Sequence, residues 1–203
     1  MTTQQLNLVS LVSLVVCWGV FVLVWLAGAI YYQSRAPAER TRSWVGSTLP
    51  IGVVVIIVVA IAVPRADWAS VGPHQAWIRL LGLVILLAGT GFTVWARLAL
   101  GAMWSGAPAV KQEHQLRTIG PYAVTRHPIY TGLLGMMLGS GLLAGGRWIV
   151  VFPVFLVLFE LKIHIEERFM TAEFPDEYPR YRQRVPQLVP GLRRPGRRRV
   201  ASG

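Results

Sequence analysis

The stretch Glu113–Tyr130, EHQLRTIGPYAVTRHPIY, is a dense polar segment in a chain that is 54% hydrophobic, and it leads directly into an apolar run. A second polar segment, Glu160–Glu167 (ELKIHIEE), ends another apolar run. Ionisable groups at the edge of a bilayer are costly to hold there, so they are functional candidates by default. Two such segments in one small apolar chain predict an active site at a membrane surface.

The composition is typical of a polytopic membrane protein. Only 14% of the residues are charged, whereas a soluble domain carries roughly 25%. A membrane-spanning helix needs roughly 20 apolar residues. We therefore predict an all-α fold with about five transmembrane helices, which correspond to the runs Leu6–Tyr31, Trp44–Val63, Trp77–Leu98, the shorter Ile129–Ala144, and Trp148 to about Ile165.

The last two of these runs are predicted to form a tight helical hairpin, because only a short glycine-containing turn separates them. The spacing Gly135-x-x-x-Gly139 in the fourth run permits close contact between helices. The glycines of this run either serve packing alone or make room for a ligand. Cys17 lies within the first apolar run, where we expect a small buried side chain and not a reactive thiol.

The basic residues predict the orientation in the membrane, because cytoplasmic loops carry an excess of Lys and Arg. With five spans, one side holds only Arg65, Arg79 and Arg147. Both polar segments and the C-terminus are therefore expected in the cytoplasm, with the N-terminus outside, in a bacterial inner or plasma membrane.

The net charge of +11 does not indicate nucleic acid, since nearly half of it lies in the tail after Leu192, RRPGRRRVASG. Anionic lipid headgroups are the simpler partner for this tail. The alternative is a tail that only sets the topology.

The chain divides into three regions. Residues 1–110 hold the first three helices, residues 111–190 form the predicted catalytic region, and residues 191–203 are the basic tail. After Glu167 the chain becomes amphipathic, with Phe174, Tyr178, Tyr181 and Val185 at helical spacing. Asp176 can cap a short helix here, and Pro179 fits its first turn. Such a helix would lie in the membrane interface or close over the site.

The end of the first polar segment is suited to binding a ligand. Pro128 fits the first position of a helix, which places Arg126 and His127 at an N-terminus whose backbone N–H groups favour an anion. Tyr130 lies in the first turn, and the tight turn at residues 120–122 (GPY) brings backbone close to a ligand. These contacts suit a zwitterionic ligand with a purine. The alternative is an ordinary helix cap in a basic loop.

In the second polar segment, Glu160, His164 and Glu167 fall at i, i+4 and i+7 and share one helix face. A carboxylate on this face could hold a ribose hydroxyl or a sulfonium cation. Lys162 and Glu166 form a separate i,i+4 pair. The alternative, a helix end with internally paired charges, suits Lys162 and Glu166 better than Glu160, which lies deeper in the apolar run.

Both segments carry a family pattern. The first block reads His114-x-Leu116-x-Thr118-x-Gly120-Pro121-Tyr122 and then Arg126-His127-Pro128-x-Tyr130-x-Gly132, and the second contains Glu166-Glu167, Phe174, Tyr178, Tyr181, Val185-Pro186 and Pro190. Over residues 111–190 the chain resembles the isoprenylcysteine carboxyl methyltransferase and phospholipid methyltransferase superfamily. It departs from the pattern at Pro175, where a glycine is usual, and at Gln187, where a basic residue is frequent.

The resemblance implies an integral membrane methyltransferase that uses S-adenosylmethionine, with a helical fold. We expect no metal, because the sequence contains no cluster of Cys and His residues with the spacing of metal ligands. Its catalytic positions fall on Arg126, Tyr130 and Glu167. Its cofactor-binding positions and their neighbours fall on Lys111, Gln112, His114, Gln115, Gly120, Tyr122, His127, Tyr130, Glu166 and Glu167.

The acceptor is the open question. A carboxylate acceptor needs no general base, only a cation that positions it, and Arg126 is the candidate. An amine acceptor needs a base such as His127, His114 or Glu167. We expect O-methylation of a carboxyl group on a lipophilic acceptor that arrives laterally through the membrane. A phospholipid N-methyltransferase acting on ethanolamine headgroups is the second hypothesis, and a non-catalytic lipid-binding protein is the third.

Overall fold

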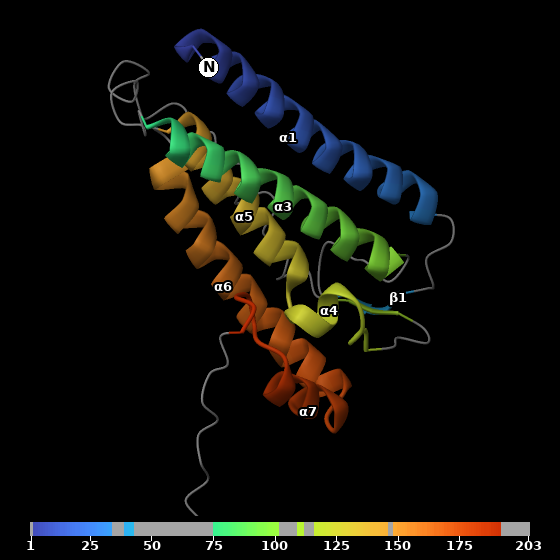
Figure 1. The fold of residues 1–203 in the computed structure, drawn as a ribbon. Coiled ribbons are helices and arrows are strands. Elements are labelled where there is room, and N and C mark those ends of the chain that lie inside the picture. Colours follow the sequence, from blue (N-terminus) through green and yellow to red (C-terminus); the bar gives the residue numbers. More distant parts are fainter. Residues whose placement is uncertain are drawn as a thin grey trace, which may run out of the picture.

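The computed structural model describes residues 2–33, 39–42, 75–101, 109–111, 116–145 and 148–191. Helices make up most of this part of the chain, which confirms the predicted all-α fold (Figure 1). They are α1 (Thr3–Gln33), α3 (Ala76–Leu100), α4 (Pro121–Val124), α5 (Pro128–Ala144), α6 (Trp148–Glu173) and α7 (Glu177–Arg184). The predicted helix over Trp44–Val63 lies outside the described residues.

Besides the helices, the described residues contain a short antiparallel pair of strands. The sequence did not predict this pair. Strand β1 (Glu39–Arg42) pairs with β2 (Ala109–Lys111), with Glu39 opposite Lys111 and Arg42 opposite Ala109. An irregularity in register lies between Glu39 and Thr41. The pair links the stretch after α1 to the stretch just before the first polar segment.

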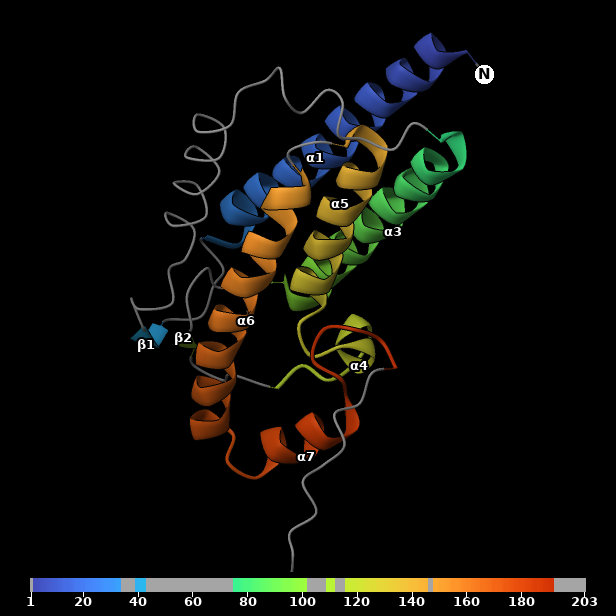
Figure 2. The same cartoon turned by 90° about the vertical axis from the view of Figure 1, so that its left-hand side faces the viewer.

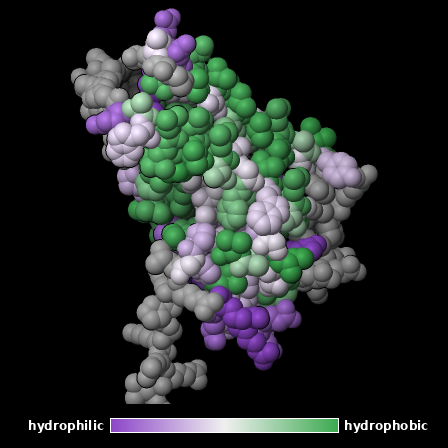
Figure 3. All heavy atoms as spheres, viewed as in Figure 1, coloured by the Kyte–Doolittle hydropathy of each residue, from purple (hydrophilic) through white to green (hydrophobic). Residues whose placement is uncertain are grey.

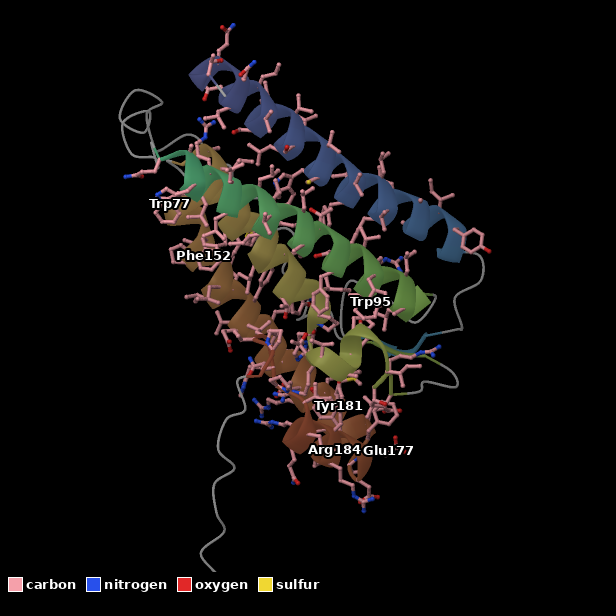
Figure 4. All side chains as sticks on the ribbon, viewed as in Figure 1. Trp77, Trp95, Phe152, Glu177, Tyr181 and Arg184 are labelled. Atoms are coloured by element: carbon pink, nitrogen blue, oxygen red, sulfur yellow. The ribbon has the colours of Figure 1, made fainter. Side chains whose placement is uncertain are left out.

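Within the described residues, two helices are long and apolar enough to cross a membrane, α1 over Gln4–Tyr31 and α3 over its whole length. Figure 3 shows a broad apolar surface between hydrophilic residues at the N-terminal tip of α1 and a hydrophilic end over α7. Trp77 and Trp95 lie at opposite ends of α3 (Figure 4), and they are 65% and 49% exposed. Exposed tryptophans at the two ends of an apolar helix are typical of anchors at the two membrane interfaces.

Glycines allow α3 and α5 to pack in close backbone contact. A Cβ atom added at Gly89 would lie 2.7 Å from the backbone nitrogen of Met136, and one added at Gly82 would lie 2.9 Å from the carbonyl oxygen of Gly139. Neither distance leaves room for a methyl group. These two glycines lie on α3, and the same holds across the contact on α5, where a Cβ atom added at Gly132 would lie 2.8 Å from the carbonyl oxygen of Gly89. The glycine of α5 therefore serves helix packing, one of the two roles left open by the sequence.

Helix α1 packs on α3 and α5 through a small apolar core. Cys17, Leu86, Met136 and Leu143 are buried together there, which confirms the buried position expected for Cys17. The indole nitrogen of Trp18 donates to the hydroxyl of Ser140 at 3.1 Å, which fixes α1 against α5.

Helices α5 and α6 lie side by side as the predicted hairpin, and α7 turns back beneath α6 (Figure 2). Gly145 ends α5 with φ 67° and donates its N–H to the carbonyl of Gly141 at 2.7 Å. Helix α6 continues past the predicted apolar run to Glu173. Glu166 and Glu167 therefore lie inside a helix, and the helix sets the direction of both side chains.

Candidate functional site

The first polar segment leads into α5 as predicted. Gly120 adopts a positive φ of 63° at the turn before α4. Helix α5 begins at Pro128 with His127 as its N-cap. However, the backbone N–H groups of Arg126 and His127 already donate to the carbonyls of Pro186 (2.8 Å) and Gln187 (3.2 Å). These two N–H groups are therefore not available to an anion, because the chain itself supplies their acceptors.

Residues 185–188, here called the strap, cross the start of α5. Thr131 donates its hydroxyl to the carbonyl of Leu188 at 2.7 Å. The side-chain amide of Gln187 donates to Glu160 Oε2 at 2.8 Å, which ties the strap to α6. The Tyr181 hydroxyl donates to the Tyr122 carbonyl at 2.6 Å and holds α7 against α4. The strap and α7 thus cover the loop that contains Arg126 and His127.

A buried ion pair joins the two polar segments. Arg126 donates to Glu167 Oε1 from Nε at 2.9 Å and from Nη2 at 2.7 Å. Its Nη1 donates to the carbonyls of Arg182 and Val185. The two paired side chains are only 7% and 9% exposed. All three guanidinium nitrogens of Arg126 therefore have protein acceptors. The carboxylate that Arg126 binds in this structure is that of Glu167, whereas the sequence suggested the carboxylate of the acceptor.

The imidazole of His127 lies between the two carboxylates. Its Nδ1 is 3.6 Å from Glu166 Oε2, and its Nε2 is 3.4 Å from Glu167 Oε1. Nε2 is buried without a hydrogen-bond partner. Tyr130 stacks on His127 with an interplanar angle of 15° and donates its hydroxyl to Glu166 Oε1 at 2.7 Å. A buried ring nitrogen without a partner beside two carboxylates is suited to a polar ligand.

The predicted face of α6 is wrong in part. Glu160 and His164 are exposed, whereas Lys162 is 7% exposed and Glu167 is 7% exposed. Lys162 and Glu166 do form the predicted i,i+4 pair, at 3.4 Å. That pair nevertheless points into the site, because Glu166 also contacts residues of α5. Glu160 belongs to the rim, where it accepts from the strap.

The surroundings of Glu167 favour its charged form. Burial alone would raise the pKa of Glu167, but the neighbouring His127 and Arg126 together lower it to about 2. Burial also raises the pKa values of Tyr122, Tyr178 and Tyr181 above the ordinary value for tyrosine. The three phenols therefore stay neutral, and Glu167 stays anionic at neutral pH.

The residues expected at the site are found in three situations. The buried cluster and its immediate neighbours contain Gly120, Tyr122, Arg126, His127, Tyr130, Glu166 and Glu167. Lys111 lies in β2, where only its backbone is described. Gln112, His114 and Gln115 lie outside the described residues. Within the described ranges no group of His, Cys, Asp or Glu side chains could hold a metal ion.

Three residues that contact the buried cluster were not among the predicted site residues. Thr131 and Arg182 were not singled out, and Lys162 was assigned only to an ion pair with Glu166. Arg182 Nε is 3.4 Å from Glu167 Oε2, and Thr131 anchors the strap. The position of Lys162 in the sequence could have indicated that its side chain faces the site. It falls on one helical face with Phe155, Phe159 and Glu166, at i, i+4, i+7 and i+11, and that face is the one that packs toward α5.

The chain is similar to methyltransferases and to metal-resistance proteins. The family model described as phospholipid methyltransferase matches residues 77–177. The protein-S-isoprenylcysteine O-methyltransferase of Schizosaccharomyces pombe is 35% identical over 100 residues, which are 47% of this chain and 42% of that protein. The cobalt-zinc-cadmium resistance protein CzcN of Cupriavidus metallidurans is 30% identical over 118 residues, 57% of this chain and 52% of that protein.

A solved structure has a similar fold. It is that of the eukaryotic intramembrane Ras methyltransferase ICMT (isoprenylcysteine carboxyl methyltransferase), with a TM-score of 0.53 and 25% identity. The similarity covers 57% of this chain and 43% of that one. The chain thus spans about half the length of the relatives it matches.

Proposed function

Because the chain belongs to the superfamily of phospholipid and isoprenylcysteine carboxyl methyltransferases, we propose that it is a membrane methyltransferase that uses S-adenosylmethionine. Its acceptor is a carboxyl group on a lipophilic molecule. The observation that carries the proposal is the buried cluster in which Arg126, His127 and Tyr130 of one polar segment meet Glu166 and Glu167 of the other. Chemistry at a membrane surface needs such a polar, water-excluding site next to apolar helices.

The residues present fit this cofactor. His127 offers the buried Nε2 atom to a polar group of the ligand, and the ring of Tyr130 offers an aromatic face. Glu166 and Glu167 provide negative charge for a cation or for ribose hydroxyls. When bound, S-adenosylmethionine supplies a methyl group on a positively charged sulfur. The family resemblance adds Lys111, Gln112, His114 and Gln115 to the proposed cofactor contacts.

The chain's own task is alignment and the exclusion of water. Holding two reactants in the correct geometry accounts for a large part of the barrier reduction in such reactions. The ion pair between Arg126 and Glu167 fixes the loop, α6 and the strap in one arrangement. The strap and α7 then cover the cluster, which limits water at the reacting groups.

The membrane placement belongs to the same proposal. Five spans would put both polar segments, α7 and the basic tail on the cytoplasmic side, where a water-soluble cofactor is available. The acceptor would arrive laterally from the apolar side, between helices. The support is the excess of Lys and Arg on that side and the apolar surface above the site.

A phospholipid N-methyltransferase is the second candidate, since the matching family model carries that description. An ethanolamine amine must lose a proton before it can accept a methyl group, and His127 or Glu167 would be the base. Glu167 is a poor base because its pKa is held near 2, so this route would depend on His127.

The purified protein in lipid nanodiscs should transfer radiolabelled methyl groups from S-adenosylmethionine into a lipid extract supplemented with an S-isoprenylcysteine. Base hydrolysis of a methyl ester releases volatile methanol, whereas N-methyl groups stay with the lipid. Volatile label supports the proposal, and non-volatile label supports the second candidate. No transfer at all, with folded protein that binds the cofactor, would reject both acceptors.

A further inference from the structure

Lys162 is a buried charge between the carboxylate cluster and the apolar run. The residue is 7% exposed, and its Nζ lies 3.4 Å from Glu166 Oε1, the oxygen that also accepts the Tyr130 hydroxyl. Phe159 is on the same face of α6 and stacks on Tyr130 at 4.9 Å between ring centroids. Among the described charged residues on this face of α6, Lys162 is the one farthest into the apolar run. Ionisable side chains in such positions mark substrate pathways.

The other cations of the cluster serve different partners. The three guanidinium nitrogens of Arg126 donate to Glu167 and to the carbonyls of Arg182 and Val185. The Arg182 side chain is 54% exposed and faces Glu167 from α7. Both arginines therefore lie beside the strap. Along α6, Lys162 precedes Glu167, the residue that both arginines contact, so Lys162 lies nearer to the apolar run than either arginine.

We propose that Lys162 binds the carboxylate of the acceptor and so selects acidic over basic headgroups. This inference rests on the function proposed above and specifies the acceptor as a carboxylate on a long apolar chain. An ammonium and a carboxylate form a strong charge-assisted hydrogen bond. The ammonium group of Lys162 would repel an acceptor that carries its own ammonium group, whereas the neighbouring carboxylate of Glu166 would attract it. The Tyr130–Phe159 stack provides the adjoining apolar wall, and Glu166 lies one helical turn from Lys162.

The test uses three amphiphiles that share a farnesyl chain and differ in headgroup: farnesylthioacetate, its neutral amide farnesylthioacetamide, and the amine farnesylthioethylamine. Binding is measured by calorimetry in nanodiscs with saturating S-adenosylhomocysteine. The wild type should bind the carboxylate about ten- to a hundredfold more tightly than the amide, as expected for one charge-assisted hydrogen bond. Lys162→Met should bind both equally, and Lys162→Arg should keep most of the preference.

Arg168→Met is the matched control, because Arg168 is an exposed cation on the same helix, and its preference should equal that of the wild type. If Lys162→Met does not fold, Lys162→Gln gives the same readout. A carboxylate preference that survives loss of the ammonium, or no such preference in the wild type, would overturn the proposal. So would loss of S-adenosylhomocysteine binding in Lys162→Met, since Lys162 would then serve the cofactor. If the wild type fails to bind S-adenosylhomocysteine, the proposed function itself fails.

Discussion

At the level of single residues, the guanidinium of Arg126 links three parts of the chain. It reaches α6 through Glu167, α7 through the carbonyl of Arg182, and the strap through the carbonyl of Val185. The sequence placed Arg126 and Glu167 in the same site. It did not show that they are each other's partners, because they are 41 residues apart and the contact depends on how α6 packs.

Glu167→Gln should lower stability and cofactor affinity more than Glu166→Gln. Removing one partner of a buried ion pair costs about 3–5 kcal/mol, because the other charge stays buried and uncompensated. Glu167 is that partner for Arg126, whereas the Glu166 side chain is 23% exposed. Thermal unfolding in detergent and titration with S-adenosylhomocysteine measure the two effects.

Arg168→Ala is the control for a lost surface charge and should change neither the unfolding temperature nor the affinity for S-adenosylhomocysteine. Arg126→Ala combined with Glu167→Gln should cost less than the sum of the single changes, since each already breaks the same pair. Equal, small losses for Glu166→Gln and Glu167→Gln would show that the ion pair does not hold the site together.

Lowering the pH should break the ion pair between Arg126 and Glu167. The pKa of Glu167 is about 2 in the folded chain, below its ordinary value of 4.5. Its contribution to stability is therefore complete above about pH 4.5 and is lost progressively as the pH falls toward 2. The gap in unfolding temperature between the wild type and Glu167→Gln should narrow as the pH is lowered from 6 to 3. A gap that stays constant over this range would contradict the assigned pKa.

At the level of elements, the contact between α3 and α5 depends on missing side chains. Gly139→Ala should destabilise the protein, because the new Cβ would lie 2.5 Å from the backbone nitrogen of Leu86. The helices would have to move apart. Gly91→Ala is the matched control on α3, since a Cβ there meets nothing within 4 Å. It should be neutral or stabilising by roughly 0.5–1 kcal/mol. In the same detergent, Gly139→Ala should lower the unfolding temperature, and Gly91→Ala should leave it unchanged or raise it. Equal shifts in the two variants would argue against close packing of α3 and α5.

The strap is the second element that can be tested. A chain shortened after Leu192 keeps every strap contact and should bind S-adenosylhomocysteine normally. It should associate less with anionic vesicles, because each arginine removed contributes about 1 kcal/mol near such a surface.

A chain shortened after Arg184 loses the carbonyl acceptors of Arg126, His127 and Thr131 and should lose cofactor binding. Normal binding by the shorter chain would remove the strap from the site.

Local signals explain which elements the sequence could predict. Apolar runs of sufficient length predicted α1, α3 and α5, and proline placed the start of α5 at Pro128. The strap was not predictable as a pairing partner, because carbonyls from the far end of the chain satisfy the N–H groups of Arg126 and His127. The orientation of α6 was misassigned at Glu160 because depth in an apolar run does not determine which face is buried.

At the level of the whole molecule, the polar site lies at one end of an apolar helical body. The apolar surface covers the helices above it, and the hydrophilic end is formed over α7, where Glu177, Tyr181 and Arg184 lie (Figures 3 and 4). Under the proposed function, the cofactor would reach the cluster from the hydrophilic end and the acceptor from the apolar side.

The central claim is that the two polar segments build one cofactor site, and titration of S-adenosylhomocysteine into the purified protein tests it most directly. The account predicts saturable binding at one site per chain, and loss of that binding in His127→Ala, which removes the buried ring between Glu166 and Glu167. Folded wild-type protein that shows no heat of binding at about 1 mM ligand, where a free energy of only about −4 kcal/mol would register, would contradict it.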